Sequence, residues 1–184
     1  MLHALAIPLS TSSPVTLAPD HARVLGGLYR DHAGAIFRAL RRWGVPDRHA
    51  DDALQETFLI ASRKLGEFEG RSTHLTWLFG IALRVARGVR RKRVLETVDD
   101  WDAVDDRSGA DEQLDARRAA AQLDRLLAEL DESQREVFVL AELEQLSAPE
   151  IAEITGAKLN TVYSRLRLAR QAVQKAFAES KEGR

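Results

Sequence analysis

What this sequence lacks sets the first limits on what it encodes. Its 184 residues contain no cysteine, which excludes disulfides, thiolate metal ligands and cysteine nucleophiles and is typical of a reducing compartment. No apolar run approaches the roughly 18 to 20 residues that span a bilayer, and the N-terminal stretch lacks the basic flank of a secretory signal. We therefore expect a cytoplasmic protein without membrane insertion, zinc fingers or disulfides.

Net charge is also nearly absent, but the charges are segregated along the chain. The formal net charge is -1, from 27 basic and 28 acidic residues. Basic side chains crowd residues 84–93 and 165–170, whereas residues 96–115 are strongly acidic. Because local charge decides local partners, both basic clusters are candidate nucleic-acid contacts.

The hydrophobic pattern predicts an all-α protein of two small helical domains joined by an acidic flexible linker. Residues 1–19 are rich in Ser, Thr and Pro and predict a flexible extension. Apolar residues at three- and four-residue steps predict a three-helix bundle over 20–93, with breaks at 44–46 and 66–70. Within it, Asp47 is expected to cap the second helix, and the third is expected to begin near Ser72.

The second half of the chain is predicted to form another helical domain after a polar segment. Residues 94–112 carry many acidic residues and no sustained apolar period, which predicts an extended linker. A second helical domain follows over 113–178, and residues 179–184 form a tail. Ser133 with Glu136, and Ser147 with Glu150, have the spacing of capping boxes that open helices.

Residues 147–170 have the form of a helix-turn-helix. The small Ala152 allows two helices to approach, Gly156 supplies the turn, and Val162 packs the second helix on the first. The polar face of the second helix carries residue types suited to phosphates and base edges in a major groove. These candidate DNA contacts are Asn160, Thr161, Tyr163, Ser164, Arg165, Arg167 and Arg170.

Two long stretches resemble a known family. The stretch LDESQREVFVLAELEQLSAPEIAEITGAKLNTVYSRLRLAR is similar to region 4 of the extracytoplasmic-function (ECF) sigma factors of the sigma-70 family, which reads the minus-thirty-five promoter element. YRDHAGAIFRALRRWGV, ADDALQETFLIASRKL and RSTHLTWLFGIALRVARGVRRKR resemble region 2. The resemblance implies a non-enzymatic, cofactor-free subunit that binds core RNA polymerase and promoter DNA, promotes strand opening, and is controlled by an anti-sigma factor. Tyr163 and Leu168 depart from the basic residues common in the family, so the base preference is not carried over.

The resemblance also assigns roles in the first domain. Asp52, Gln55 and Glu56 share one polar helix face, which in the family docks on a basic clamp of the polymerase; a solvated acidic patch is the alternative. The minus-ten surface implied by the resemblance combines aromatic and polar residues for the captured strand with arginines for its backbone. Its members are Phe68, Arg71, Ser72, Thr73, His74, Thr76, Trp77, Arg84, Arg87 and Arg91.

Several alternatives remain open at this level. Trp77 lies beside an apolar run and is equally explained as a core residue. The acidic linker, with its lone Trp101, is either a solvated tether or a segment that threads the polymerase. A stand-alone helix-turn-helix regulator leaves the first domain unexplained. A metalloenzyme rests only on the helical spacing of His49, Asp52 and Glu56, which lack the outer shell that catalytic metals need.

Overall fold

The computed structural model describes residues 19–95 and 121–182, and within these ranges every element is a helix. Residues 1–18 of the predicted extension, residues 96–112 of the predicted linker with Trp101, residues 113–120 of the predicted second domain, and the last two residues lie outside this part of the chain. None of the helices described is long and apolar enough to cross a membrane. The all-α prediction is confirmed.

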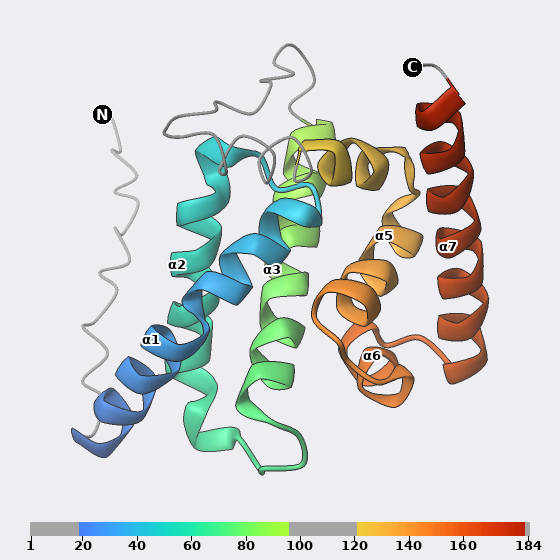
Figure 1. Cartoon of the computed structure of the whole chain (residues 1–184). Helices are drawn as coiled ribbons and strands as arrows, with labels where there is room; N and C mark the ends of the chain where they lie inside the picture. Colours follow the sequence, from blue (N-terminus) through green and yellow to red (C-terminus); the bar gives the residue numbers. More distant parts are fainter. Residues whose placement is uncertain (1–18, 96–120, 183–184) are drawn as a thin grey trace, which may run out of the picture.

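The first domain is a bundle of three helices. Helices α1 (Pro19–Arg42), α2 (Asp47–Lys64) and α3 (His74–Leu95) pack against one another (Figure 1). Trp43, which is fully buried, meets the edge of Phe79 with ring centroids 6.2 Å apart. This contact joins the end of α1 to α3 and fixes how the two helices cross, because interior side chains pack at close to crystal density.

The observed helix boundaries agree with one of the predicted boundaries and differ from others. Gly44 has φ +86, a conformation that favours glycine, and the break after α1 falls there as predicted. The predicted cap by Asp47 is wrong, because Pro46 occupies the N-cap position and the Asp47 carboxylate instead accepts from Arg41 Nε at 2.6 Å. The third helix begins at His74, two residues after Ser72, near which its start was predicted.

The second domain consists of short helices and one long one. Residues 121–129 are helical, followed by α5 (Glu132–Phe138), the π-helical η2 (Val139–Leu143), α6 (Ala148–Thr155) and α7 (Leu159–Glu182). Their inward side chains Val137, Leu140, Ile151 and Val162 are fully buried. The core exists only when the helices are assembled, since helices as short as α5 and α6 are marginal alone.

Of the two predicted capping boxes, one is present. The Ser147 backbone N–H donates to Glu150 Oε2 at 2.9 Å, and the box at the start of α6 is complete. The box predicted for Ser133 and Glu136 is wrong. Asp131 caps α5 instead, its carboxylate accepting from the Gln134 backbone N–H at 2.9 Å.

The two domains lie against each other. Figure 1 shows α3 between the other two helices of the first domain and helices α5 to α7 of the second. Helix α3 packs on α6, and the buried residues of both domains form one continuous cluster. A short 3-10 turn, η1 (Leu65–Glu67), and the loop after it lead from α2 into α3.

The cap assignment predicts different effects for two neighbouring substitutions. Asp131→Ala removes an N-cap acceptor, and we expect it to lower the free energy of unfolding by about 1 kcal/mol. Ser133→Ala removes only a hydroxyl that donates to Asp131, and we expect a much smaller loss. Chemical denaturation of both variants, followed by circular dichroism, measures this; equal losses would contradict the cap assignment.

The same cap has a defined pH dependence. Slight burial raises the pKa of Asp131, but hydrogen bonds from the backbone N–H of Gln134 and from Ser133 outweigh it and lower the pKa below its ordinary value. A lowered pKa in the folded state stabilises the fold above the unfolded pKa of about 4 and loses this effect as the pH falls. The Asp131→Ala difference should therefore shrink below about pH 4.

Candidate nucleic-acid interface

Helix α7 presents the predicted major-groove residues to solvent. Gly156 has φ +71, the left-handed conformation that ends α6 and turns the chain toward α7. Val162 and Leu166 are buried on the inner side of α7. The predicted contacts Asn160, Tyr163, Ser164, Arg167 and Arg170 are exposed, whereas Thr161 and Arg165 are half-buried. The predicted helix-turn-helix is confirmed.

Two of the polar side chains on this face, Ser164 and Arg170, already have partners within the chain. Ser164 Oγ donates to the Asn160 carbonyl at 2.9 Å, so it is free only as an acceptor. Arg170 donates through two nitrogens to Glu142 Oε1, at 2.7 and 2.9 Å. Tyr163 is 54% exposed, so its ring is accessible to a partner.

The loop before α3 gathers the predicted aromatic residues. Phe68 stacks on His74 with ring centroids 4.4 Å apart and lies 5.3 Å from Trp77 at a tilted angle. All three side chains are half-buried. Trp77 is therefore neither a pure core residue nor a free surface residue, and the three rings form one cluster with an accessible edge.

The first turn of α3 is fixed by threonines. Thr73 Oγ1 accepts from the Thr76 backbone N–H at 3.1 Å and shares a hydrogen bond with the Thr76 hydroxyl at 2.8 Å. Thr76 is only 2% exposed, and its hydroxyl also donates to Glu150 Oε1 of α6 at 3.1 Å. A residue predicted to contact the minus-ten strand thus lies under the second domain.

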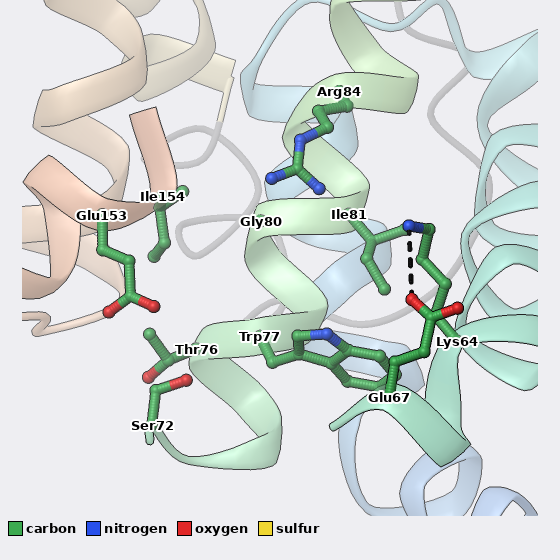
Figure 2. A pocket seen from close by; sticks show the side chains of 10 residues that line it. All are labelled: Lys64, Glu67, Ser72, Thr76, Trp77, Gly80, Ile81, Arg84, Glu153 and Ile154. Atoms are coloured by element: carbon green, nitrogen blue, oxygen red, sulfur yellow. Dashed lines mark ion pairs between the residues drawn. The ribbon is translucent and has the colours of Figure 1, made fainter. Parts of the chain in front are cut away.

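A pocket of about 180 Å³ lies where α3 meets α6. Figure 2 shows Ser72 and Thr76 facing Glu153 across it, with Trp77 extending along the floor and Arg84 farther along α3. Four of the ten predicted minus-ten residues therefore line one cavity, and the acidic side chain of Glu153 from the other domain shares it.

The arginines of this surface differ in their surroundings. Arg84 and Arg91 are exposed, and Arg71, also exposed, pairs with Glu69 at 3.1 Å. Arg87 is half-buried, donating to both carboxylate oxygens of Glu136 at 2.9 and 2.6 Å. Arg84 and Arg91 are thus directly accessible to a phosphate, whereas Arg87, whose side chain is 40% exposed, has two of its nitrogens bonded to Glu136.

Arg90 completes this cluster between the domains. Its side chain is 9% exposed and donates to the Trp43 carbonyl at 2.6 Å and to Glu136 Oε1 at 2.7 Å. Burial raises the pKa of Glu136, but the hydrogen bonds from Arg87 and Arg90 outweigh it and lower the pKa below its ordinary value. Glu136 is therefore a charged carboxylate held between two guanidinium groups.

The importance of Glu136 was missed by sequence reasoning, which placed this residue in a capping box. It lies directly before the apolar run 137–140, and an acidic residue at the start of a buried run was the available signal, since buried carboxylates need cationic partners. Its partners lie more than 40 residues away in the sequence.

The predicted acidic face of α2 is intact. Asp52, Gln55 and Glu56 are exposed, on the side of the helix away from the buried Leu54 and Phe58. Beside this face, α1 and α2 enclose a largely apolar groove of about 700 Å³. The groove includes Tyr29 and Leu59, which are about half exposed.

The metal hypothesis finds no geometric support in the described ranges. No group of three or more His, Asp or Glu residues there is arranged to hold a metal ion. His49, the proposed nitrogen ligand, accepts a hydrogen bond at Nε2 from Arg48 Nε at 3.2 Å.

These features define a DNA-binding protein of two helical domains, and comparison with known proteins identifies its family. Residues 28–95 match the family model for sigma-70 region 2, and residues 120–173 match the model for sigma-70 region 4. The RNA polymerase sigma factor NccH of Alcaligenes xylosoxydans xylosoxydans is 32% identical over 152 residues, which cover 79% of this chain and 82% of NccH. The ECF RNA polymerase sigma-E factor of Salmonella typhimurium is 33% identical over 141 residues, covering 70% and 74% of the two chains.

Solved structures agree with this comparison. CnrH, determined in complex with the cytosolic domain of CnrY, is 29% identical with a TM-score of 0.67, covering 86% of this chain and 90% of CnrH. CnrH of Cupriavidus metallidurans is also a sequence relative, 31% identical over 164 residues, which cover 83% of this chain and 86% of CnrH. The sigma factor RpoE, crystallised with the anti-sigma factor NepR from Bartonella quintana, shares the fold with a TM-score of 0.71, 21% identity, and coverage of 85% and 98% of the two chains.

The chain therefore belongs to the sigma-70 family, within its ECF class. It acts in transcription initiation as a sigma factor, and it is not an enzyme. The family and the function predicted from the resemblance are confirmed, and the stand-alone regulator and metalloenzyme hypotheses are set aside.

The exposed face of α7 predicts two kinds of variant. Arg167→Ala should weaken promoter binding alike for all sequences and reduce the salt slope by about 1, as loss of a phosphate contact does. Tyr163→Ala should change the preferred sequence more than the affinity. Sequence selection and salt titration of the holoenzyme on duplex promoters measure both; an altered consensus for Arg167→Ala with none for Tyr163→Ala would reverse these roles.

Proposed function

We propose that this sigma factor uses three separate surfaces of the structure. The acidic face of α2 docks on core polymerase, the start of α3 with its preceding loop captures the minus-ten strand, and the outer face of α7 reads the minus-thirty-five element. The observation that carries the proposal is the separation of charge and aromatic residues among these surfaces. Each surface has the chemistry of one partner.

The polymerase surface is supported by the exposure of its side chains and by their negative charge. The carboxylates of Asp52 and Glu56 and the amide of Gln55 are exposed on one face of α2, so a basic partner can reach them without unfolding. Complementary charge directs encounter and register more than it adds affinity. The neighbouring groove with Tyr29 and Leu59 adds apolar area that such a partner can bury.

For the minus-ten surface, the support is an aromatic cluster beside arginines. Opening one DNA step removes about 1.4 kcal/mol of stacking on average, and a base stacked on an aromatic ring recovers about 1 to 3 kcal/mol. The cluster of Phe68, His74 and Trp77 offers such rings. Arg84 and Arg91, both exposed on α3, are placed to hold the backbone of the same strand.

For regulation, the support comes from relatives. CnrH was solved with the cytosolic domain of CnrY, and RpoE with the anti-sigma factor NepR. We propose that this chain too is controlled by an anti-sigma factor, and that it works in the cytoplasm, where it meets polymerase and DNA. No cofactor takes part in this scheme.

The polymerase surface predicts a charge-reversal effect. Asp52→Lys with Glu56→Lys places like charge against a basic partner, and we expect core binding to weaken at least roughly 100-fold, about 3 kcal/mol. Comigration with core polymerase on a sizing column measures the change. Asp31→Lys with Glu129→Lys, at exposed positions elsewhere, alters net charge equally and should bind normally. Unchanged comigration of the first variant would refute the assignment.

The aromatic cluster predicts a defect in strand opening alone. Phe68→Ala removes the ring that contacts both His74 and Trp77, and we expect closed complexes to form normally while thymine reactivity to permanganate in the minus-ten region is lost. Gel shift and permanganate footprinting of the same complexes separate the two steps. A premelted bubble template should restore transcription only partly, because the cluster also holds the strand. Normal reactivity in the variant would place capture elsewhere.

A further inference from the structure

We propose that the cavity between α3 and α6 is a binding site for a free α-amino acid with an aromatic or branched apolar side chain. The cavity has a volume of about 180 Å³, and it is lined by the end of α2 with the turn that follows, by one face of α3, and by Glu153 and Ile154 of α6. Its lining combines an apolar region with separate positive and negative groups. Each of these parts matches one part of such a molecule.

The cavity depends on a glycine in the middle of α3. Thr76, Gly80 and Arg84 follow one another at four-residue steps, so they lie on the same side of the helix. Gly80 is buried, yet a Cβ atom added there would meet nothing within 4 Å beyond its own part of the helix. Glycine destabilises a helix interior relative to alanine, and here the missing side chain leaves room for a ligand.

The inner part of the cavity suits an apolar group of modest size. Ile81 and Ile154 are buried beside it, and the half-buried Trp77 forms one wall, with its indole ring along the floor in Figure 2. An engineered apolar cavity of about 150 Å³ accommodates benzene. The space here is therefore large enough for a phenyl ring or a branched alkyl group, and Trp77 adds a favourable contact for an aromatic ring.

Two charged side chains at the cavity are available to a ligand. Arg84 on α3 and Glu153 on α6 are exposed, and neither makes a hydrogen bond or ion pair with any residue that the structure describes. Figure 2 shows them on different helices beside the same space. A guanidinium group binds a carboxylate through two parallel hydrogen bonds, and a carboxylate binds an ammonium group. Arg84 can therefore hold the carboxylate of a ligand while Glu153 holds its ammonium group.

The balance of charge selects the class of ligand. Lys64 and Glu67, which also line the cavity, pair with each other at 3.9 Å, so one positive and one negative group are left for the ligand. Glu153 would repel a phosphate or a dicarboxylate, and Arg84 would repel a polyamine. A zwitterion satisfies both charges. An α-amino acid carries its ammonium and carboxylate groups on one carbon, from which an apolar side chain can extend toward Trp77.

The site shares Trp77 and Arg84 with the proposed minus-ten surface. The site itself is defined by the cavity and its charges, and only its effect on DNA binding rests on the proposed function. A bound amino acid would contact the Trp77 ring and the Arg84 guanidinium, which a single strand needs for stacking and for its backbone. We therefore expect the ligand to weaken binding of a single strand by the full chain.

The first test is calorimetric titration of the full chain with small probes that differ in charge. L-phenylalanine and L-leucine carry both charged groups, whereas 3-phenylpropanoate lacks the ammonium group and phenethylamine lacks the carboxylate. Loss of either charge should weaken binding about two- to fivefold relative to L-phenylalanine, as expected for exposed charge pairs. Failure of both amino acids to bind, or equal affinity for L-phenylalanine and its two analogues, would overturn the proposal.

The second test fills the cavity. Gly80→Leu places a side chain in the proposed ligand space, and we expect it to weaken binding of L-phenylalanine at least roughly tenfold, because a core-sized side chain and a ligand cannot share one close-packed space. Gly88→Leu is the matched control: Gly88 is also on α3 and a Cβ there also meets nothing within 4 Å, but it does not line the cavity. Circular dichroism checks that both variants are folded. Unchanged binding by Gly80→Leu, or an equal loss in both variants, would refute the location.

Two charge-neutral variants assign the ends of the ligand and do not depend on whether Gly80→Leu folds. Glu153→Gln should weaken L-phenylalanine about two- to fivefold without weakening 3-phenylpropanoate, which has no ammonium group to lose. Arg84→Gln should weaken L-phenylalanine to a similar degree without weakening phenethylamine. If either variant weakens its two probes alike, or neither probe at all, that residue does not bind the ligand as proposed.

A competition experiment separates the site from the proposed function. The probe is a fluorescent single strand of about 12 nucleotides, titrated with the full chain in the presence and absence of saturating L-phenylalanine. We expect weaker strand binding with the amino acid and no such effect for Gly80→Leu. Calorimetric binding of L-phenylalanine without competition would support the site and count against Trp77 and Arg84 as strand contacts. Absence of calorimetric binding would overturn the site, while permanganate footprinting of the Phe68→Ala holoenzyme would still test the minus-ten surface.

Discussion

The rest of the structure depends on how one buried carboxylate is satisfied. Glu136 is 4% exposed, and an ionised side chain in that position is tolerated only with cationic partners and well-formed hydrogen bonds. Both partners come from α3 of the other domain. The need to neutralise this charge therefore fixes where α5 sits on α3, and with it the position of the second domain.

Helix α3 packs against the first domain with one face and against the second domain with another. Its apolar residues, including Leu78 and Phe79, are fully buried among the helices of the first domain. Its polar and basic residues face the other way, toward α5, α6 and solvent. Because a helix separates such faces by its 3.6-residue period, one element holds the bundle together and presents the surface proposed to bind the minus-ten strand.

Helix α7 differs from α3 because its outer face is exposed to solvent. Inward residues Val162 and Leu166 anchor α7, and most of its polar side chains are exposed on the opposite face. A rigid support with an exposed reading face lets the base preference vary without disturbing the core. This explains how Tyr163 and Leu168, unusual for the family at these positions, are accommodated: both are exposed, so neither changes a buried contact.

Local rules allowed the sequence alone to predict much of this protein. The helical periods, the breaks at Gly44 and Gly156 and the capping box of Ser147 and Glu150 depend on residues within one or two turns of each other. Prediction from these signals succeeded for the all-helical fold, the helix-turn-helix and, through resemblance, the family. The exposed face of Asp52, Gln55 and Glu56 followed from spacing on a single helix.

Only the tertiary structure decided which polar residues remain available. The spacing of Ser133 and Glu136 fits a capping box, yet Glu136 pairs with arginines 46 and 49 residues away, because a buried ion pair depends on helix packing rather than on sequence distance. Thr76 likewise meets Glu150 across 74 residues. Sequence periodicity assigns a residue to the polar face of its helix, but only packing between helices determines whether that face meets water, DNA or another domain.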